Sequence, residues 1–161
     1  MIDEERLAAA WKTRIKHFPM EIEFDYPLDT ALISLTGTAC ALNCAHCGGH
    51  YLKHMTPIWK AKTPKATSCL ISGGCDAQGR VPVTEHLEQI AAWRDGRRLN
   101  WHVGFVNEED VQAIAPFVDM VSFDFVGDDE TIREVYGLAK SVADYATCYQ
   151  LLRRYLPVTP H

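Results

Sequence analysis

Several features that mark large classes of protein are missing from this sequence. None of its apolar runs approaches the roughly 20 residues that a membrane-spanning helix needs. Lysine and arginine number 16 against 21 acidic residues, and the charges are interspersed, so there is no basic patch or arm for nucleic acid. Internal repeats and low-complexity tracts are also missing. We therefore expect a globular protein with neither a membrane nor a nucleic acid as its partner.

The cysteine content is too low for a disulfide scaffold. Six cysteines in 161 residues fall far below the density of disulfide-rich domains, and no signal-peptide pattern opens the chain. The hydrophobic content of 47% suits one domain with a real core. We expect reduced cysteines and a cytoplasmic location.

Three of the cysteines stand close together in residues 34–50, SLTGTACALNCAHCGGH. Cys40, Cys44 and Cys47 have the spacing C-x3-C-x2-C, directly after an apolar, strand-like run. Such a loop can place three thiolates around a [4Fe–4S] cluster, which normally takes four cysteines. With three, one iron stays open to bind something other than protein.

A zinc site is the alternative for the same residues. Three cysteines with His46 or His50 would make a Cys3His set, which is common for structural zinc. Zinc knuckles, however, usually bring their ligands as two separated pairs. The spacing therefore favours the iron–sulfur cluster and leaves zinc as the competing interpretation.

Hydrophobic periodicity predicts alternating strands and helices joined by short connections. The alternation implies parallel strands with right-handed crossovers, in an α/β fold. The predicted strands are residues 30–37, 68–72, 99–105 and 120–126, with a fifth beginning in 156–161. The predicted helices are residues 4–17, 51–60 (broken at Pro57), 84–95, 108–115, one capped by Asp128, and 141–155.

These elements predict a partial (β/α) barrel of about four to five βα units, the N-terminal half of a barrel. Residues 1–29 form an N-terminal helical extension, and residues 30–161 form the half-barrel. Such a sheet would leave an apolar concave face and an unprotected edge. We therefore expect the barrel to be incomplete at its C-terminus, in a split, truncated or partnered protein.

Polar residues alternate with apolar ones along the predicted strands, which places them on the inner face of the barrel. A purely structural barrel interior is filled mainly by Val, Ile and Leu, and unpaired buried polar groups are costly. The pattern favours a polar ligand pocket at the C-terminal rim, although these groups could instead bond one another or the backbone. The set comprises Ser34, Thr36, Asn100, His102, Gly104, Ser122 and Asp124.

A glycine pair, Gly73 and Gly74, ends the second predicted strand at the same rim. Adjacent glycines let a backbone come close to a ligand and expose its carbonyls. An ordinary tight turn is the alternative.

The cysteine pattern and its position resemble the radical S-adenosylmethionine (radical SAM) superfamily. In that family the open iron binds S-adenosylmethionine (SAM), and one electron cleaves it to methionine and a 5′-deoxyadenosyl radical, which abstracts hydrogen from a substrate. The resemblance implies that Cys40, Cys44 and Cys47 bind the [4Fe–4S] cluster. His46 takes the place of the aromatic residue that often precedes the third cysteine.

The same resemblance implies a binding site for SAM and an external reductant such as ferredoxin or flavodoxin. The segment of Ser72, Gly73 and Gly74 matches the one that binds the methionine amine. Ser122 and Asp124 stand where the ribose or the methionine carboxylate is often held.

More narrowly, the sequence resembles a biotin-synthase-related branch, near the two-component lipoate synthases. This branch implies a small-molecule or protein-bound acyl substrate, sulfur insertion, and a partner subunit or homodimer that completes the barrel. Cys75, where many members have an acidic residue, is a candidate auxiliary-cluster ligand, and His50 with His54 is a candidate metal pair. A non-catalytic iron–sulfur or zinc module that acts with a partner is the alternative function. The matching residues are 34–48, 71–76 with 79–82, and 122–128 with 131–132.

Overall fold

The computed structural model describes residues 3–22, 24, 26 and 28–161, and its centre is one parallel sheet. The strand order is β2-β1-β3-β4-β5-β6, and every neighbouring pair runs parallel. The predicted class, an α/β fold built as a partial parallel barrel, is confirmed. The strands are β1 (Thr30–Ser34), β2 (Thr56–Pro57), β3 (Ser68–Ser72), β4 (Arg98–His102), β5 (Met120–Phe123) and β6 (Val158–Pro160).

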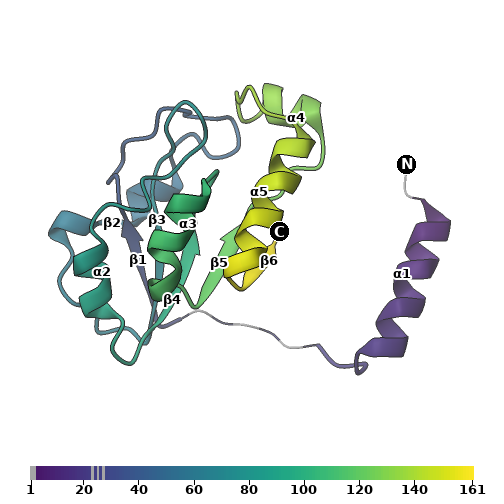
Figure 1. Ribbon diagram of the computed structural model, residues 1–161, viewed down its shortest axis with the longest axis horizontal. Helices are drawn as coiled ribbons and strands as arrows, with labels where there is room; N and C mark the ends of the chain where they lie inside the picture. Colours follow the sequence, from purple (N-terminus) through teal and green to yellow (C-terminus); the bar gives the residue numbers. More distant parts are fainter. Residues whose placement is uncertain (1–2, 23, 25, 27) are drawn as a thin grey trace.

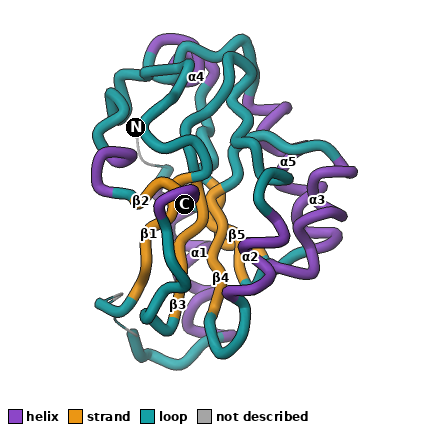
Figure 2. Tube along the Cα trace, turned by 90° about the vertical axis from the view of Figure 1, so that its left-hand side faces the viewer, coloured by secondary structure: helices purple, strands orange, loops and turns teal. Residues whose placement is uncertain are grey.

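Helices cover one face of this sheet and leave the other to loops (Figure 2). On the covered face lie α2, α3 and α5, while α4 stands at one end (Figures 1 and 2). None of the described helices is long and apolar enough to span a bilayer. The helices are α1 (Glu4–His17), α2 (Leu87–Trp93), α3 (Glu108–Ile114), α4 (Asp129–Glu134) and α5 (Val142–Tyr155), with 3-10 turns at Tyr51–His54 (η1), Ile58–Lys60 (η2) and Ala115–Phe117 (η3).

Burial alternates along β4 and β5, and along β3 up to Ile71, and this alternation builds the core on the covered face. Trp101 is fully buried, and its indole Nε1 donates a hydrogen bond to the Phe117 carbonyl at 2.9 Å. The residues between these buried positions face the opposite side of the sheet, where the polar set was predicted. The core-facing strand residues are Cys69, Ile71, Leu99, Trp101, Val121 and Phe123, which cluster with Ile90, Ile114 and Leu152 of the helices.

The helix predicted over residues 51–60 is wrong. Two 3-10 turns, η1 and η2, occupy this segment, and the short strand β2 lies between them beside β1. Pro57 explains the difference, because proline offers no backbone N–H and forces the residue before it into an extended conformation. Thr56 and Pro57 therefore continue the sheet edge instead of a helix.

Ser34 was predicted to line a polar pocket, but for this residue the alternative interpretation, a hydrogen bond to the backbone, applies. Its side chain is fully buried, and its hydroxyl donates a hydrogen bond to the Gly37 carbonyl at 2.7 Å. Ser34 therefore anchors the loop that follows β1. Thr36 serves the same loop, since its Oγ1 accepts a hydrogen bond from the Gly74 N–H at 2.6 Å.

The N-terminal helix α1 stands apart from the sheet (Figure 1). Asp3 caps it by accepting hydrogen bonds from the backbone N–H groups of Glu5 and Arg6. No residue of α1 is buried, and its apolar stripe is more than half exposed. The stripe comprises Leu7, Trp11, Ile15 and Phe18.

The capping box of α3 gives a stability prediction. The Asn107 side chain accepts a hydrogen bond from the Asp110 N–H at 2.8 Å, and Asp110 accepts one from the Asn107 N–H. Replacing Asn107 with Ala removes this acceptor, so we expect the free energy of unfolding to fall by about 1 kcal/mol. Urea unfolding measures the difference. Asn107→Asp keeps an acceptor and should remain close to wild type, and equal losses in both variants would contradict the capping explanation.

Candidate functional site

The cysteine loop follows β1 and is tied to two other parts of the chain. The Ala41 N–H donates to the Cys75 carbonyl at 2.8 Å, and the Ala45 N–H donates to the Val135 carbonyl at 2.9 Å. Within the loop, the N–H groups of Cys47 and Gly48 both donate to the Cys44 carbonyl. Backbone hydrogen bonds therefore fix a tight turn that carries the three cysteines. All three are free thiols of intermediate exposure.

Gly74 lets this loop pack against the end of β3. A Cβ atom at Gly74 would lie 2.7 Å from both Cα and Cβ of Cys40, and nearer still to the Ala39 carbonyl oxygen. Real Cβ atoms do not approach that closely, so only glycine fits here. The first cysteine of the loop is thus placed by backbone-to-backbone contact with Gly74.

A cavity of about 560 Å³ lies beside the cysteine loop. Eight of the nine residues predicted from the sequence for cluster and SAM binding line it: Cys40, Cys44, His46, Cys47, Ser72, Gly73, Ser122 and Asp124. Gly74 does not; it lines a neighbouring cavity of about 430 Å³ that also reaches Cys40. The volume of the larger cavity is in the range of small-molecule and cofactor sites.

The polar wall of this cavity is partly satisfied by its own hydrogen bonds. Asn100 Nδ2 lies 3.0 Å from Ser122 Oγ, and the Ser72 hydroxyl donates to the His102 carbonyl at 3.1 Å. The alternative interpretation, in which these groups bond one another or the backbone, therefore applies to Ser122 and Ser72 respectively. Asp124 differs from these residues in its partners, because its carboxylate faces the imidazoles of His102 and His161.

His46 stacks on a residue that the sequence did not single out, Tyr136. The two ring centroids are 5.2 Å apart and the planes differ by 20°. Burial, together with the charges of Asp124, Cys44 and Cys47, raises the pKa of the Tyr136 hydroxyl. Tyr136 follows α4 in a connection, where no periodicity marks it as a lining residue. The pair forms an aromatic wall beside the second and third cysteines.

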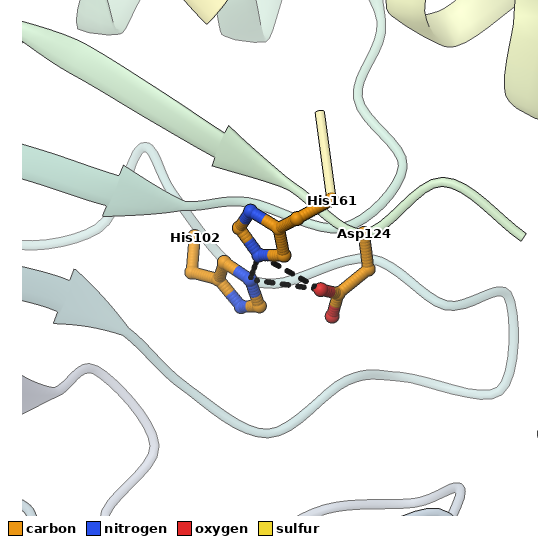
Figure 3. Close-up of side chains that lie close together, drawn as sticks. All are labelled: His102, Asp124 and His161. Atoms are coloured by element: carbon orange, nitrogen blue, oxygen red, sulfur yellow. Dashed lines mark hydrogen bonds and ion pairs between the residues drawn. The ribbon is translucent and has the colours of Figure 1, made fainter. Parts of the chain in front are cut away.

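Asp124 and two histidines meet where β4, β5 and β6 end (Figure 3). Asp124 Oδ1 lies 3.3 Å from His102 Nε2 and 3.1 Å from His161 Nε2. Burial alone would raise the pKa of the Asp124 carboxyl, but the hydrogen bond from His102 and the charges of the imidazoles lower it. His161 is a second residue that the sequence did not single out, although it lies in the segment predicted to begin a fifth strand.

The arrangement of the thiols bears on the choice between zinc and a cluster. A tetrahedral zinc ion with Zn–S bonds of about 2.3 Å brings its sulfurs within about 3.8 Å of one another. Among the described residues, the loop cysteines do not gather their ligand atoms within 4.8 Å of one another. In this structure the three thiols are therefore not gathered as the ligands of a single zinc ion.

A fourth thiol, Cys75, stands next to the loop. Burial raises the pKa of this thiol to about 12, and the nearby Cys40, Cys44 and Cys47 add to the shift. Burial also raises the pKa of Cys44. Cys75 is thus a close neighbour of all three loop cysteines.

The fold that carries this site occurs in a solved enzyme. No family model matches the sequence, and no curated protein matches it. Among solved structures, the chain is similar to methylornithine synthase (PylB), with a TM-score of 0.58 and 15% sequence identity. The match covers 99% of this chain and 51% of that enzyme, so the chain spans about half the length of its structural relative. At this identity the likeness defines the class of fold, a partial parallel (β/α) barrel.

Proposed function

We propose that this chain is a radical SAM protein that binds a [4Fe–4S] cluster through Cys40, Cys44 and Cys47 and SAM in the adjoining cavity. The observation that carries the proposal is the position of the three free thiols. They line a 560 Å³ cavity that also reaches polar residues at the carboxyl ends of the strands, among them Ser122, Asp124 and His161. The shared fold with methylornithine synthase, a radical SAM enzyme, supports the same class.

Under this proposal the residues around the cavity have three roles: the cysteines hold the cluster, the glycines shape the backbone beside it, and the polar and aromatic side chains orient SAM. Cys40, Cys44 and Cys47 would hold three irons of the cluster, and the cluster would supply the one electron that cleaves SAM to methionine and a 5′-deoxyadenosyl radical for hydrogen abstraction. Gly73 presents backbone at the cavity wall, where the methionine amine of SAM can approach closely. Gly74, which faces the loop, acts by placing Cys40 instead of touching SAM.

The remaining polar and aromatic groups orient the cofactor. Asp124 carries a negative charge beside the cavity and can accept hydrogen bonds from ribose hydroxyls, with Ser122 next to it on the same strand face. The stacked rings of His46 and Tyr136 offer SAM an aromatic surface beside Cys44 and Cys47. These groups bind SAM; none of them needs to transfer a proton.

The substrate and partners belong to the proposal as well. The resemblance to the biotin-synthase-related branch favours a small-molecule or protein-bound acyl substrate and sulfur insertion. We place the partner subunit, or a second copy of the chain, beside the edge strand β6, where it would extend the barrel. A ferredoxin or flavodoxin would supply the electron.

Anaerobic reconstitution tests this function. The chain is loaded with iron and sulfide, then incubated with SAM and dithionite, and 5′-deoxyadenosine is measured by chromatography. We expect visible absorbance from thiolate-bound iron and formation of 5′-deoxyadenosine. Stoichiometric zinc, with no iron uptake and no 5′-deoxyadenosine, would instead support the metal-binding module that acts only with a partner.

A further inference from the structure

The cluster of His102, Asp124 and His161 has the geometry of a metal site (Figure 3). Its three ligand atoms are separated by 3.1, 3.3 and 3.4 Å, which makes a nearly equilateral triangle. A tetrahedral ion with bonds of about 2.0–2.1 Å requires ligand atoms about 3.3–3.4 Å apart. Among the described residues, this is the one group of three His, Cys, Asp or Glu side chains gathered so closely.

The strand register explains why these residues meet. His102 ends β4 opposite Ser122 of β5, and Phe123 pairs with Pro160 of β6. Asp124 and His161 each follow the paired residue by one position, so they lie side by side. His161 is held firmly, since its N–H donates to the Phe123 carbonyl at 3.1 Å and its carbonyl accepts from the Phe125 N–H at 2.9 Å. Three adjacent strands thus present one ligand each.

Hydrogen bonds without a metal satisfy this triangle only in part. Each Nε2 atom can carry a single proton, so both imidazoles can donate to Asp124 Oδ1, which leaves the 3.4 Å contact between His102 and His161 without a hydrogen bond. If one imidazole donates to the other instead, the accepting Nε2 has no proton for Asp124. One cation at the centre accepts a lone pair from all three atoms and removes this conflict.

We propose that His102, Asp124 and His161 bind a divalent transition-metal ion, Zn²⁺ or Fe²⁺, on the wall of the cavity. Two imidazoles and one carboxylate are the ligand set of many catalytic zinc and non-haem iron sites, which keep a coordination position open. Mg²⁺ and Ca²⁺ prefer oxygen ligands and fit the set less well. All three residues line the 560 Å³ cavity, so the open position faces it.

This site goes beyond the proposed function, because it requires neither the cluster nor SAM. The open position would take an anionic or amine group of a substrate in the cavity. Both short contacts of Asp124 use Oδ1, so Oδ2 remains for a hydrogen bond to SAM. One residue can therefore serve both ligands.

Cobalt titration of the full-length chain tests the site. Cys40, Cys44 and Cys47 are replaced together by Ala, so that thiolates do not compete, and visible spectra are recorded as Co²⁺ is added. We expect one Co²⁺ per chain with the weak bands of nitrogen and oxygen ligands and no sulfur charge-transfer band. His161→Gln and His102→Gln should each weaken binding about 100-fold or more, since loss of even an indirect partner of a metal costs 10–100-fold.

His54→Gln is the matched control, because the chain offers a second histidine pair. His50 and His54 have Nε2 atoms 3.3 Å apart but no carboxylate in the same cluster. Binding that is lost in His54→Gln but kept in His161→Gln would overturn the proposal, as would the absence of any Co²⁺ binding.

A second experiment, zinc loading, does not depend on the folding of the triple-alanine variant. The unmodified chain is loaded with Zn²⁺ and the bound zinc is counted after removal of the excess. We expect His161→Gln to retain one zinc fewer per chain than His54→Gln. Equal zinc counts in the two variants would overturn the site.

Discussion

Gly74→Ala is expected to abolish iron loading while leaving most of the sheet folded. The added methyl group would lie 2.7 Å from Cα and Cβ of Cys40 and would collide with the Ala39 carbonyl. Two of these three obstacles are backbone atoms, which cannot rotate away, so the cysteine loop must move off β3. Overpacking of this kind costs about 1–3 kcal/mol, and it displaces the first of the three thiolates. Iron and sulfide analysis after reconstitution measures the loss.

Gly127→Ala is the control for this substitution. A Cβ atom at Gly127 meets no atom within 4 Å, and its backbone does not have the positive φ that favours glycine. We expect it to load iron as the wild type does. Gly73→Ala should be intermediate, because its Cβ would lie 3.3 Å from side-chain atoms of Thr36 and Val81, which can shift. Normal iron content in Gly74→Ala would contradict the contact that places Cys40.

Cys44→Ala is expected to eliminate both the cluster and 5′-deoxyadenosine formation. The variant keeps two loop thiolates, and two are too few for a cluster that normally takes four. Cys44 is only partly buried, so its loss should change the thermal unfolding midpoint little. Iron content, visible absorbance and product formation are measured on the same preparation. Retention of full iron content would contradict the assignment of Cys44 as a ligand.

Cys75→Ala is the matched control, and it also decides whether the fourth iron is open. Cys75 lies beside the loop but outside the C-x3-C-x2-C spacing, and burial raises the pKa of its thiol to about 12. We therefore expect Cys75→Ala to keep the cluster and to form 5′-deoxyadenosine. A cluster lost in this variant would make Cys75 the fourth ligand, and SAM would then have no iron to bind.

The repeating features of the fold could be predicted from the sequence. Alternation of apolar and polar residues located β4 and β5, because each strand has one face against helices and one against a cavity. The same alternation placed Asn100, His102, Ser122 and Asp124 on the cavity wall. These predictions succeeded because they depend on local periodicity.

Features that depend on contacts between distant segments could not be predicted in this way. The proximity of His161 to Asp124 arises from the register of β6, a strand of three residues with little periodicity of its own. Tyr136 lies in a connection, and its stacking on His46 depends on how α4 packs beside the loop. The different roles of Gly73 and Gly74 likewise follow from the path of the cysteine loop. Strand alternation also could not show that the Ser34 hydroxyl bonds a local carbonyl instead of a ligand.

Electron paramagnetic resonance of the reduced cluster, recorded with and without SAM, tests the central claim most directly. With three thiolate ligands from Cys40, Cys44 and Cys47, the fourth iron can bind SAM, so we predict that adding SAM changes the spectrum of the dithionite-reduced protein. Identical spectra at saturating SAM, from a sample with full iron and sulfide content, would contradict an open iron and with it the proposed function.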